Sequence, residues 1–217
     1  MKAGSVRTES VRWSTLALVA GLAVGCDASA AMSHTGPSLF ENNCAPCHGT
    51  AGEGSTVAKA PAIAGLPEWY VKHQVEGFRE GLRGTHFDDI QGMRMRPMAR
   101  TLADDEEVAL VSKHVASLPK TKAVATLTGG DAAKGATYWQ TCAACHGADG
   151  KGNEALGAPP LAGGSDWYHL DQLKNFKAGV RGAHPKDTRG ATMRPMASTL
   201  PDEQAMKDVL AHVGTLP

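Results

Sequence analysis

The chain contains two nearly identical stretches, CAPCHG at residues 44–49 and CAACHG at residues 142–147. They lie 98 residues apart, and a shift of 98 places residues 40–119 on residues 138–217 without a gap. A period as long as a domain indicates duplication of a whole domain, because solenoid repeats are much shorter. Other identical pairs in this register are WY (69–70 and 167–168), MRPMA (95–99 and 193–197) and the HV…LP ends (114–119 and 212–217).

The pattern Cys-x-x-Cys-His is typical of covalent haem c attachment. Two cysteines at this spacing reach the two vinyl groups of one porphyrin, and the adjacent histidine is then held beneath the iron. Cys-x-x-Cys alone also fits zinc, a disulfide or a redox pair, but two copies in one register favour two haem c groups. The expected attachment residues are Cys44, Cys47, Cys142 and Cys145, and the expected iron ligands are His48 and His146.

The first residues have the pattern of an export signal. Three basic residues precede an apolar run at 14–25, which is too short to span a bilayer. AVGC at 23–26 resembles a lipoprotein cleavage site, which predicts a signal peptide over 1–25 and a lipid on Cys26. The alternative site ASA (28–30) predicts a signal over 1–30 and no lipid. We therefore expect a periplasmic protein, anchored to the inner membrane if Cys26 carries a lipid.

Composition limits the class of protein. Lys plus Arg equals Asp plus Glu at 22 each, so no basic field points to nucleic acid. Hydrophobic residues make up 42% of the chain, which excludes disorder, but aromatics are only 5%, and a porphyrin would complete each small core. The expected order is a tether (26–36), a first domain (37–119), a linker (120–130) and a second domain (131–217).

Apolar residues recur every three or four positions, as in Val108, Val111 and Val115, which predicts helices. Alternation with period two never persists, so the expected fold is all-α. Asp131 is expected to cap the helix that leads to the second motif, whereas Gly36-Pro37 shortens its counterpart. MRPMA is expected to be a short extended loop, because a proline disfavours helix in the residue before it.

The second axial ligand must occur in both copies. His114 and His212 lie in the last predicted helix and are interpreted as packed or surface residues, whereas His86 and His184 lie in a loop and remain rivals. A methionine is favoured, because its thioether is a soft ligand and the MRPMA segment is placed to cross a haem face. Residues alone do not rank Met95 and Met193 over Met98 and Met196.

With these motifs the chain resembles a duplicated class I c-type cytochrome, and it is similar to the dihaem cytochrome c-four group. The resemblance implies two tandem all-α domains that each wrap one haem c. In that superfamily the ligand methionine lies seven residues before a leucine, here Leu102 and Leu200. This register selects Met95 and Met193, and it leaves Met98 and Met196 as packing beside the haem.

The resemblance also suggests a haem environment. The carbonyls of Pro61 and Pro159 would accept a bond from each proximal histidine. Arg83 and Arg181 either pair with haem propionates or are solvated loop residues. The aromatic residues either donate to propionates or pack as haem walls: Trp69, Tyr70, Trp167 and Tyr168.

Histidine and methionine together would fill all six iron positions, which leaves no site for substrate. The expected function is therefore single-electron transfer without catalysis. Expected partners are a quinol-oxidising complex as donor and a terminal oxidase or periplasmic reductase as acceptor. The alternatives are a dihaem peroxidase-like enzyme, a sensor, and a fixed cytochrome subunit of an oxidase or reductase complex.

Overall fold

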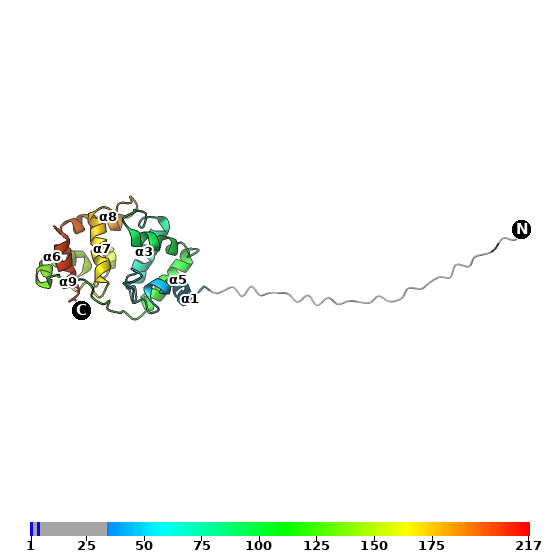
Figure 1. The fold of residues 1–217 in the computed structure, drawn as a ribbon, viewed down its shortest axis with the longest axis horizontal. Helices are drawn as coiled ribbons and strands as arrows, with labels where there is room; N and C mark the ends of the chain where they lie inside the picture. The colour runs from blue at the N-terminus through cyan, green and yellow to red at the C-terminus, as the bar shows by residue number, and fades with distance from the viewer. Residues whose placement is uncertain (2–3, 5–33) are drawn as a thin grey trace. The chain divides into compact units, whose positions relative to one another are not determined.

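The computed structural model describes residues 34–217, together with Met1 and Gly4. Cys26 and the predicted signal peptide lie outside the described residues. Residues 34–217 form one unit in which the two halves of the repeat lie side by side, with α3 and α7 at the boundary between them (Figure 1). Among the described residues no helix is long and apolar enough to cross a membrane.

The first half is built from helices that begin at good capping residues. Thr35, Asp89 and Asp104 each accept a backbone hydrogen bond from the first turn that follows, which satisfies an otherwise unpaired N–H group. The helices are α1 (Gly36–Asn43), α2 (Ala45–His48), α3 (Glu68–Glu80), α4 (Ile90–Ala99) and α5 (Asp105–Ser117).

The second half repeats this arrangement with one difference. Asp131 caps α6 as predicted, and this single helix corresponds to α1 and α2 together. In the first half the chain breaks at Cys44, where Pro46 lacks the N–H group that a continuous helix would need. The elements are α6 (Ala132–His146), the 3-10 turn η1 (Glu154–Leu156), α7 (Asp166–Lys177), α8 (Thr188–Ser198) and α9 (Glu203–Val213).

Each half has its own hydrophobic core beneath its last helix. Val108, Val111 and Val115 of α5 are almost fully buried, in agreement with the predicted apolar face. In the second half α9 packs closely on α6 at Gly135, where a Cβ would meet the carbonyl oxygen of Asp208 at 1.9 Å. Residues 34–217 contain only isolated bridges and no strand, so the all-α prediction is confirmed.

The prediction of an extended MRPMA loop is wrong. Both copies lie in helices, α4 and α8, and each carries a proline inside. Pro97 is in the last turn of α4, so its missing N–H group costs the helix one hydrogen bond, the one to the carbonyl of Met93. The cap at Asp89, which accepts from Gly92 N at 3.0 Å, fixes the start of the helix and outweighs the local preference of the residue before proline.

The linker predicted at 120–130 has no helix and runs along the second half. Asp166, at the start of α7, holds it with three hydrogen bonds, from Thr126 N, Thr126 Oγ1 and Leu127 N at 2.7, 2.7 and 2.9 Å. Ala123 N also donates to the carbonyl of Gly163 at 2.9 Å. The linker is therefore attached to the second half at defined points.

Candidate haem-binding site

One large cavity extends through both halves, and its walls contain both Cys-x-x-Cys-His motifs. Its remaining walls are mainly apolar side chains from α3, α4, α7 and α8 and from the loops after each motif. Every residue predicted to attach haem or to bind iron lines this cavity: Cys44, Cys47, His48 and Met95 from the first half, and Cys142, Cys145, His146 and Met193 from the second.

The two motif histidines are oriented in the same way. His48 Nδ1 lies 2.8 Å from the carbonyl oxygen of Pro61, and His146 Nδ1 lies 2.8 Å from that of Pro159. A carbonyl only accepts, so Nδ1 carries the proton and Nε2 has a free lone pair. Burial lowers the pKa of both histidines, and the bond to the proline carbonyl opposes this shift. Each ring is thus a neutral imidazole with one nitrogen available to a metal.

No disulfide joins any of the four cysteines of the described residues, so neither motif is closed by a disulfide. Burial, reinforced by the neighbouring Cys47, raises the pKa of Cys44 to about 11. Residues 34–217 also contain no group of three or more His, Cys, Asp or Glu side chains that could hold a metal ion. The donor set therefore suits thioether attachment of a porphyrin better than a zinc site, which needs three or four such ligands.

The structure separates the candidates for the second ligand. Met95 and Met193 are partly buried in the cavity wall, and Met98 and Met196 also reach it but are 37% exposed. His86 and His184 do not line the cavity, because the ring nitrogen of each accepts a backbone bond in its own loop at 3.2 Å. His114 and His212 pack against Phe40 and Trp139, as expected of helix residues.

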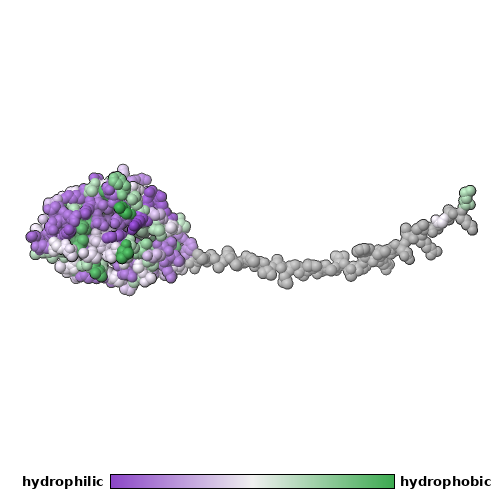
Figure 2. Space-filling model, in the orientation of Figure 1, coloured by the Kyte–Doolittle hydropathy of each residue, from purple (hydrophilic) through white to green (hydrophobic). Residues whose placement is uncertain are grey.

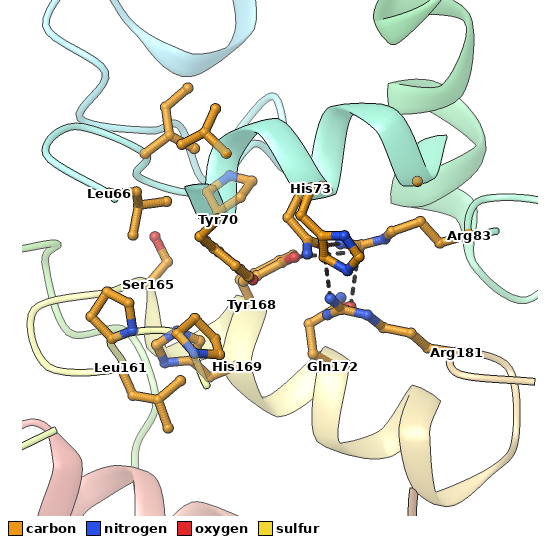
Figure 3. Close-up of a pocket in the computed structure, with 18 of the residues that line it drawn as sticks. Leu66, Tyr70, His73, Arg83, Leu161, Ser165, Tyr168, His169, Gln172 and Arg181 are labelled. Carbon is orange, nitrogen blue, oxygen red and sulfur yellow. Dashed lines mark hydrogen bonds between the residues drawn. The ribbon is translucent and has the colours of Figure 1, made fainter. Parts of the chain in front are cut away.

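A buried polar cluster joins the halves where the cavity crosses between them (Figure 3). Arg181 donates to Gln172 of its own half at 2.8 Å and to Gln74 of the other half at 2.9 Å. Arg83 donates in the same way to Gln74 and, at 3.1 Å, to Gln172. The cluster is symmetric, because Gln74 and Gln172 are repeat partners, as are Arg83 and Arg181.

Two buried guanidinium groups in one cluster need an anion, because burying unpaired charge is costly. In the part of the chain that the structure describes, neither Arg83 nor Arg181 forms an ion pair with a carboxylate, and Arg83 Nε has no hydrogen-bond partner. Haem carries two carboxylate groups, so the cluster fits the cofactor that the motifs imply. Burial of both arginines also excludes the alternative of solvated loop residues.

The predicted aromatic residues divide into two groups. Tyr70 and Tyr168 line the cavity beside the polar cluster, and Tyr168 Oη accepts from Arg83 at 3.3 Å (Figure 3). The structure does not bring the tryptophans to the cavity. Trp69 lies beneath Arg189 at 5.2 Å, and Trp167 lies beneath Lys59 at 5.3 Å, so each packs against a cation of the other half.

Sequence reasoning missed several cavity residues near the boundary, among them Gln74, Gln172 and His169. Gln74 and Gln172 occupy the same repeat position, and this identity is the signal that could have revealed them. His169 has no such signal, since its partner in the first half is Val71. Burial, followed by the neighbouring His146, lowers the pKa of His169 to about 4, so the ring is neutral at pH 7. At this one repeat position the second half therefore has a polar side chain in the cavity wall and the first half an apolar one.

The chain belongs to the cytochrome c family. The family model for cytochrome c matches residues 33–119 and again residues 132–217, one match for each half. Two cytochrome c domains carry two covalently bound haem c groups, and the residues that line the cavity suit that cofactor.

Comparison with known proteins shows which members of the cytochrome c family this chain resembles. The cytochrome c4 structure from Acidithiobacillus ferrooxidans matches 81% of this chain and 99% of its own, with a TM-score of 0.65 and 25% identity. The resemblance to dihaem cytochrome c4 is thus confirmed. The thiosulfate dehydrogenase electron acceptor of Stutzerimonas stutzeri is 31% identical over 224 residues, which cover 95% of this chain and 97% of the relative.

A third relative belongs to an oxidase. The FixP subunit of the cbb3-type cytochrome c oxidase from Bradyrhizobium diazoefficiens is 30% identical over 173 residues. The match covers 75% of this chain but only 58% of FixP. The similarity therefore concerns only part of FixP.

Proposed function

We propose that this protein carries single electrons between redox proteins and is not an enzyme. The observation that carries the proposal is that each half brings its motif histidine and its MRPMA methionines to the same cavity, and that Met95 and Met193 are the more buried of these methionines. We assign His48 with Met95, and His146 with Met193, as axial pairs. Iron held by two protein ligands in addition to the porphyrin has no open position for a substrate, and methionine ligation favours a high reduction potential.

Carbon monoxide tests this proposal directly, because it binds only where the sixth iron position is open or readily opened. The reduced holoprotein is expected to keep its haem absorption spectrum under carbon monoxide, and a redox titration is expected to show two one-electron steps. Rapid carbon monoxide binding at one haem would instead favour the dihaem peroxidase-like alternative.

The electron donor is assigned by similarity. Because the relative from Stutzerimonas stutzeri matches over nearly the whole of both chains, we propose that a thiosulfate dehydrogenase reduces this protein. A terminal oxidase or periplasmic reductase would then oxidise it. The test mixes the oxidised holoprotein with thiosulfate dehydrogenase and thiosulfate and follows haem reduction. Failure of reduction, with normal reduction by ascorbate, would reject this donor and leave quinol-oxidising complexes as the expected source.

The similarity to FixP supports a second candidate, a fixed subunit of an oxidase complex. A fixed subunit would copurify with the oxidase at constant stoichiometry after detergent extraction. A carrier would be recovered free of it.

We propose a periplasmic location, with attachment to the inner membrane through a lipid on Cys26. The support is the AVGC stretch at 23–26. Labelling of cells with palmitate is expected to mark the wild-type protein and not Cys26→Ser. An unlabelled wild-type protein in the soluble periplasmic fraction would support cleavage after residue 30 instead.

A further inference from the structure

The outward side of α4 and the turn before it carry three exposed apolar residues that are specific to one half. Phe87, Ile90 and Met93 are 75%, 56% and 40% exposed. Their repeat partners Pro185, Thr188 and Ala191 are smaller or more polar. On the face drawn in Figure 2 hydrophilic residues predominate and hydrophobic ones form small patches. Exposed apolar side chains that gather in one place often mark an interaction site.

The inward side of the same helix has diverged less. Of the α4 residues that line the cavity, Gly92, Met95, Met98 and Ala99 have identical partners in α8, whereas Gln91 and Arg94 are replaced by Arg189 and Thr192. Phe87, Ile90 and Met93 do not line the cavity, so cavity packing does not explain why these three residues differ between the halves.

Positive charge surrounds this cluster. Arg94 and Arg100 are exposed, and their repeat partners are Thr192 and Ser198. Arg94 lies 3.5 Å from the carbonyl of Ala58, and Arg100 donates to the carbonyl of Arg79 at 3.2 Å. Within residues 34–217 neither guanidinium forms an ion pair, so both charges are available to an acidic partner; Arg94 also borders the cavity, whereas Arg100 does not. We call these five residues the α4 docking face: Phe87, Ile90, Met93, Arg94 and Arg100.

We propose that the α4 docking face binds the redox partner protein, through a partner surface that has an apolar centre and carboxylates at its rim. The proposal rests on the proposed carrier function. An apolar centre with a charged rim is the usual anatomy of a transient protein interface, and opposite charges accelerate encounter. A lipid surface fits less well, because three apolar side chains offer little area for insertion.

The position of the face suits electron transfer. A partner seated on it is separated from the cavity by the thickness of one helix, about 10 Å. Met98 shortens the path further, because its side chain lines the cavity and is also 37% exposed. Electrons would therefore enter or leave through the first haem domain, and the second would exchange with it across the buried cluster of Arg83, Arg181 and the two glutamines.

The experiment uses the full-length holoprotein and thiosulfate dehydrogenase with thiosulfate as the probe. The test variant combines Ile90→Thr, Met93→Ala and Arg100→Ser, which are the residues that α8 already accommodates at these positions, and it keeps Arg94, which lines the cavity. The control variant, Val124→Thr with Lys113→Thr, removes an exposed apolar residue and an exposed cation elsewhere. Both variants should keep the wild-type haem spectrum, melting temperature and midpoint potentials.

At low ionic strength the test variant is expected to be reduced about tenfold more slowly than the wild type, and added salt should narrow this gap. The control should match the wild type. Equal rates for all three proteins would overturn the docking face and leave the carrier function intact.

Reduction of the wild type by ascorbate but not by the dehydrogenase would reject both this donor and a docking face for it. Two further measurements test whether a second copy of this chain or a membrane, and not a redox partner, binds the face. If the substitutions change the molar mass in solution, or binding to vesicles of anionic lipid, and leave the reduction rate unchanged, the face serves self-association or membrane contact and the proposal is wrong.

Discussion

Gln74 of α3 accepts a hydrogen bond at 2.9 Å from Arg181, which belongs to the other half of the repeat. Gln172 of α7 returns the contact by accepting from Arg83 at 3.1 Å. Each glutamine also accepts from the arginine of its own half, so two arginines share two acceptors across the boundary. This arrangement makes the two halves depend on each other for the pairing of buried charge.

Replacement of Gln74 by leucine is expected to destabilise the holoprotein by about 2 kcal/mol, because two buried guanidinium groups lose an acceptor at once. Unfolding in guanidinium chloride, followed by circular dichroism, measures the loss. Gln172→Leu should have a similar cost. The double variant should lose less than the sum of the two, since both substitutions remove partners of the same arginines.

A substitution on the same helix provides the control. Lys72 is partly exposed, and its Nζ lies 3.9 Å from a Glu76 oxygen. Such a surface pair contributes little, so Lys72→Gln is expected to change the free energy of unfolding by less than about 0.5 kcal/mol. Equal effects of Gln74→Leu and Lys72→Gln would show that the buried cluster does not hold the halves together.

The repeat and the Cys-x-x-Cys-His motifs were sufficient to predict the fold class and the cofactor. In a motif such as Cys44 to His48, the spacing of the residues along the chain determines which cofactor can be attached. That spacing is visible in the sequence. The periodic apolar residues, such as Val108 and Val111, report burial on one side of a helix and were also predicted correctly.

Features that depend on contacts between distant segments were not predictable in this way. The residue before Pro97 was expected to be extended, but the cap at Asp89 keeps the segment helical. Trp69 was expected near haem, whereas it packs beneath Arg189 of the other half. Both outcomes depend on contacts with other residues, which the conformational preference of a single residue does not predict.

The choice between Met95 and Met98 as iron ligand can be tested by spectroscopy. Met95 packs against the first hydrophobic core, whereas Met98 is 37% exposed, so we expect Met95 to bind iron. Met95→Ala should therefore weaken the far-red absorption band of the iron–methionine bond in the oxidised protein, and Met98→Ala should retain it. The same substitutions at Met193 and Met196 test the second haem. A band that survives loss of Met95 but not of Met98 would reverse the assignment.

Removal of one haem is expected to unfold only the half that carried it. The double substitution Cys142→Ser and Cys145→Ser prevents thioether formation in the second half, and the walls of its cavity would then lose their largest apolar contact. Limited proteolysis should cleave within residues 131–217 and leave a haem-containing fragment of the first half. The matching double substitution at Cys44 and Cys47 is the control, and it should reverse the pattern of cleavage.

The lowered pKa of Asp166 predicts how the stability of the folded state depends on pH. Partial burial alone would raise the pKa of Asp166. The hydrogen bonds from Leu127 and Thr126 outweigh this effect and hold the pKa below its ordinary value of 3.8. The folded state thus favours the carboxylate. Its contribution is fully present above the unfolded pKa and is lost as the pH falls through the folded pKa, below 3.8.

Asp166→Asn is therefore expected to cost about 1 kcal/mol at pH 7, because the carboxylate is only partly shielded from solvent. The difference from the wild type should shrink as the pH is lowered from about 5 to about 3. Asp171, on the same helix, is the matched control: burial raises its pKa, so Asp171→Asn should not destabilise the protein at pH 7. Thermal unfolding of the holoprotein across this pH range measures both variants, and a pH-independent loss in Asp166→Asn would show that ionisation of Asp166 does not hold the linker.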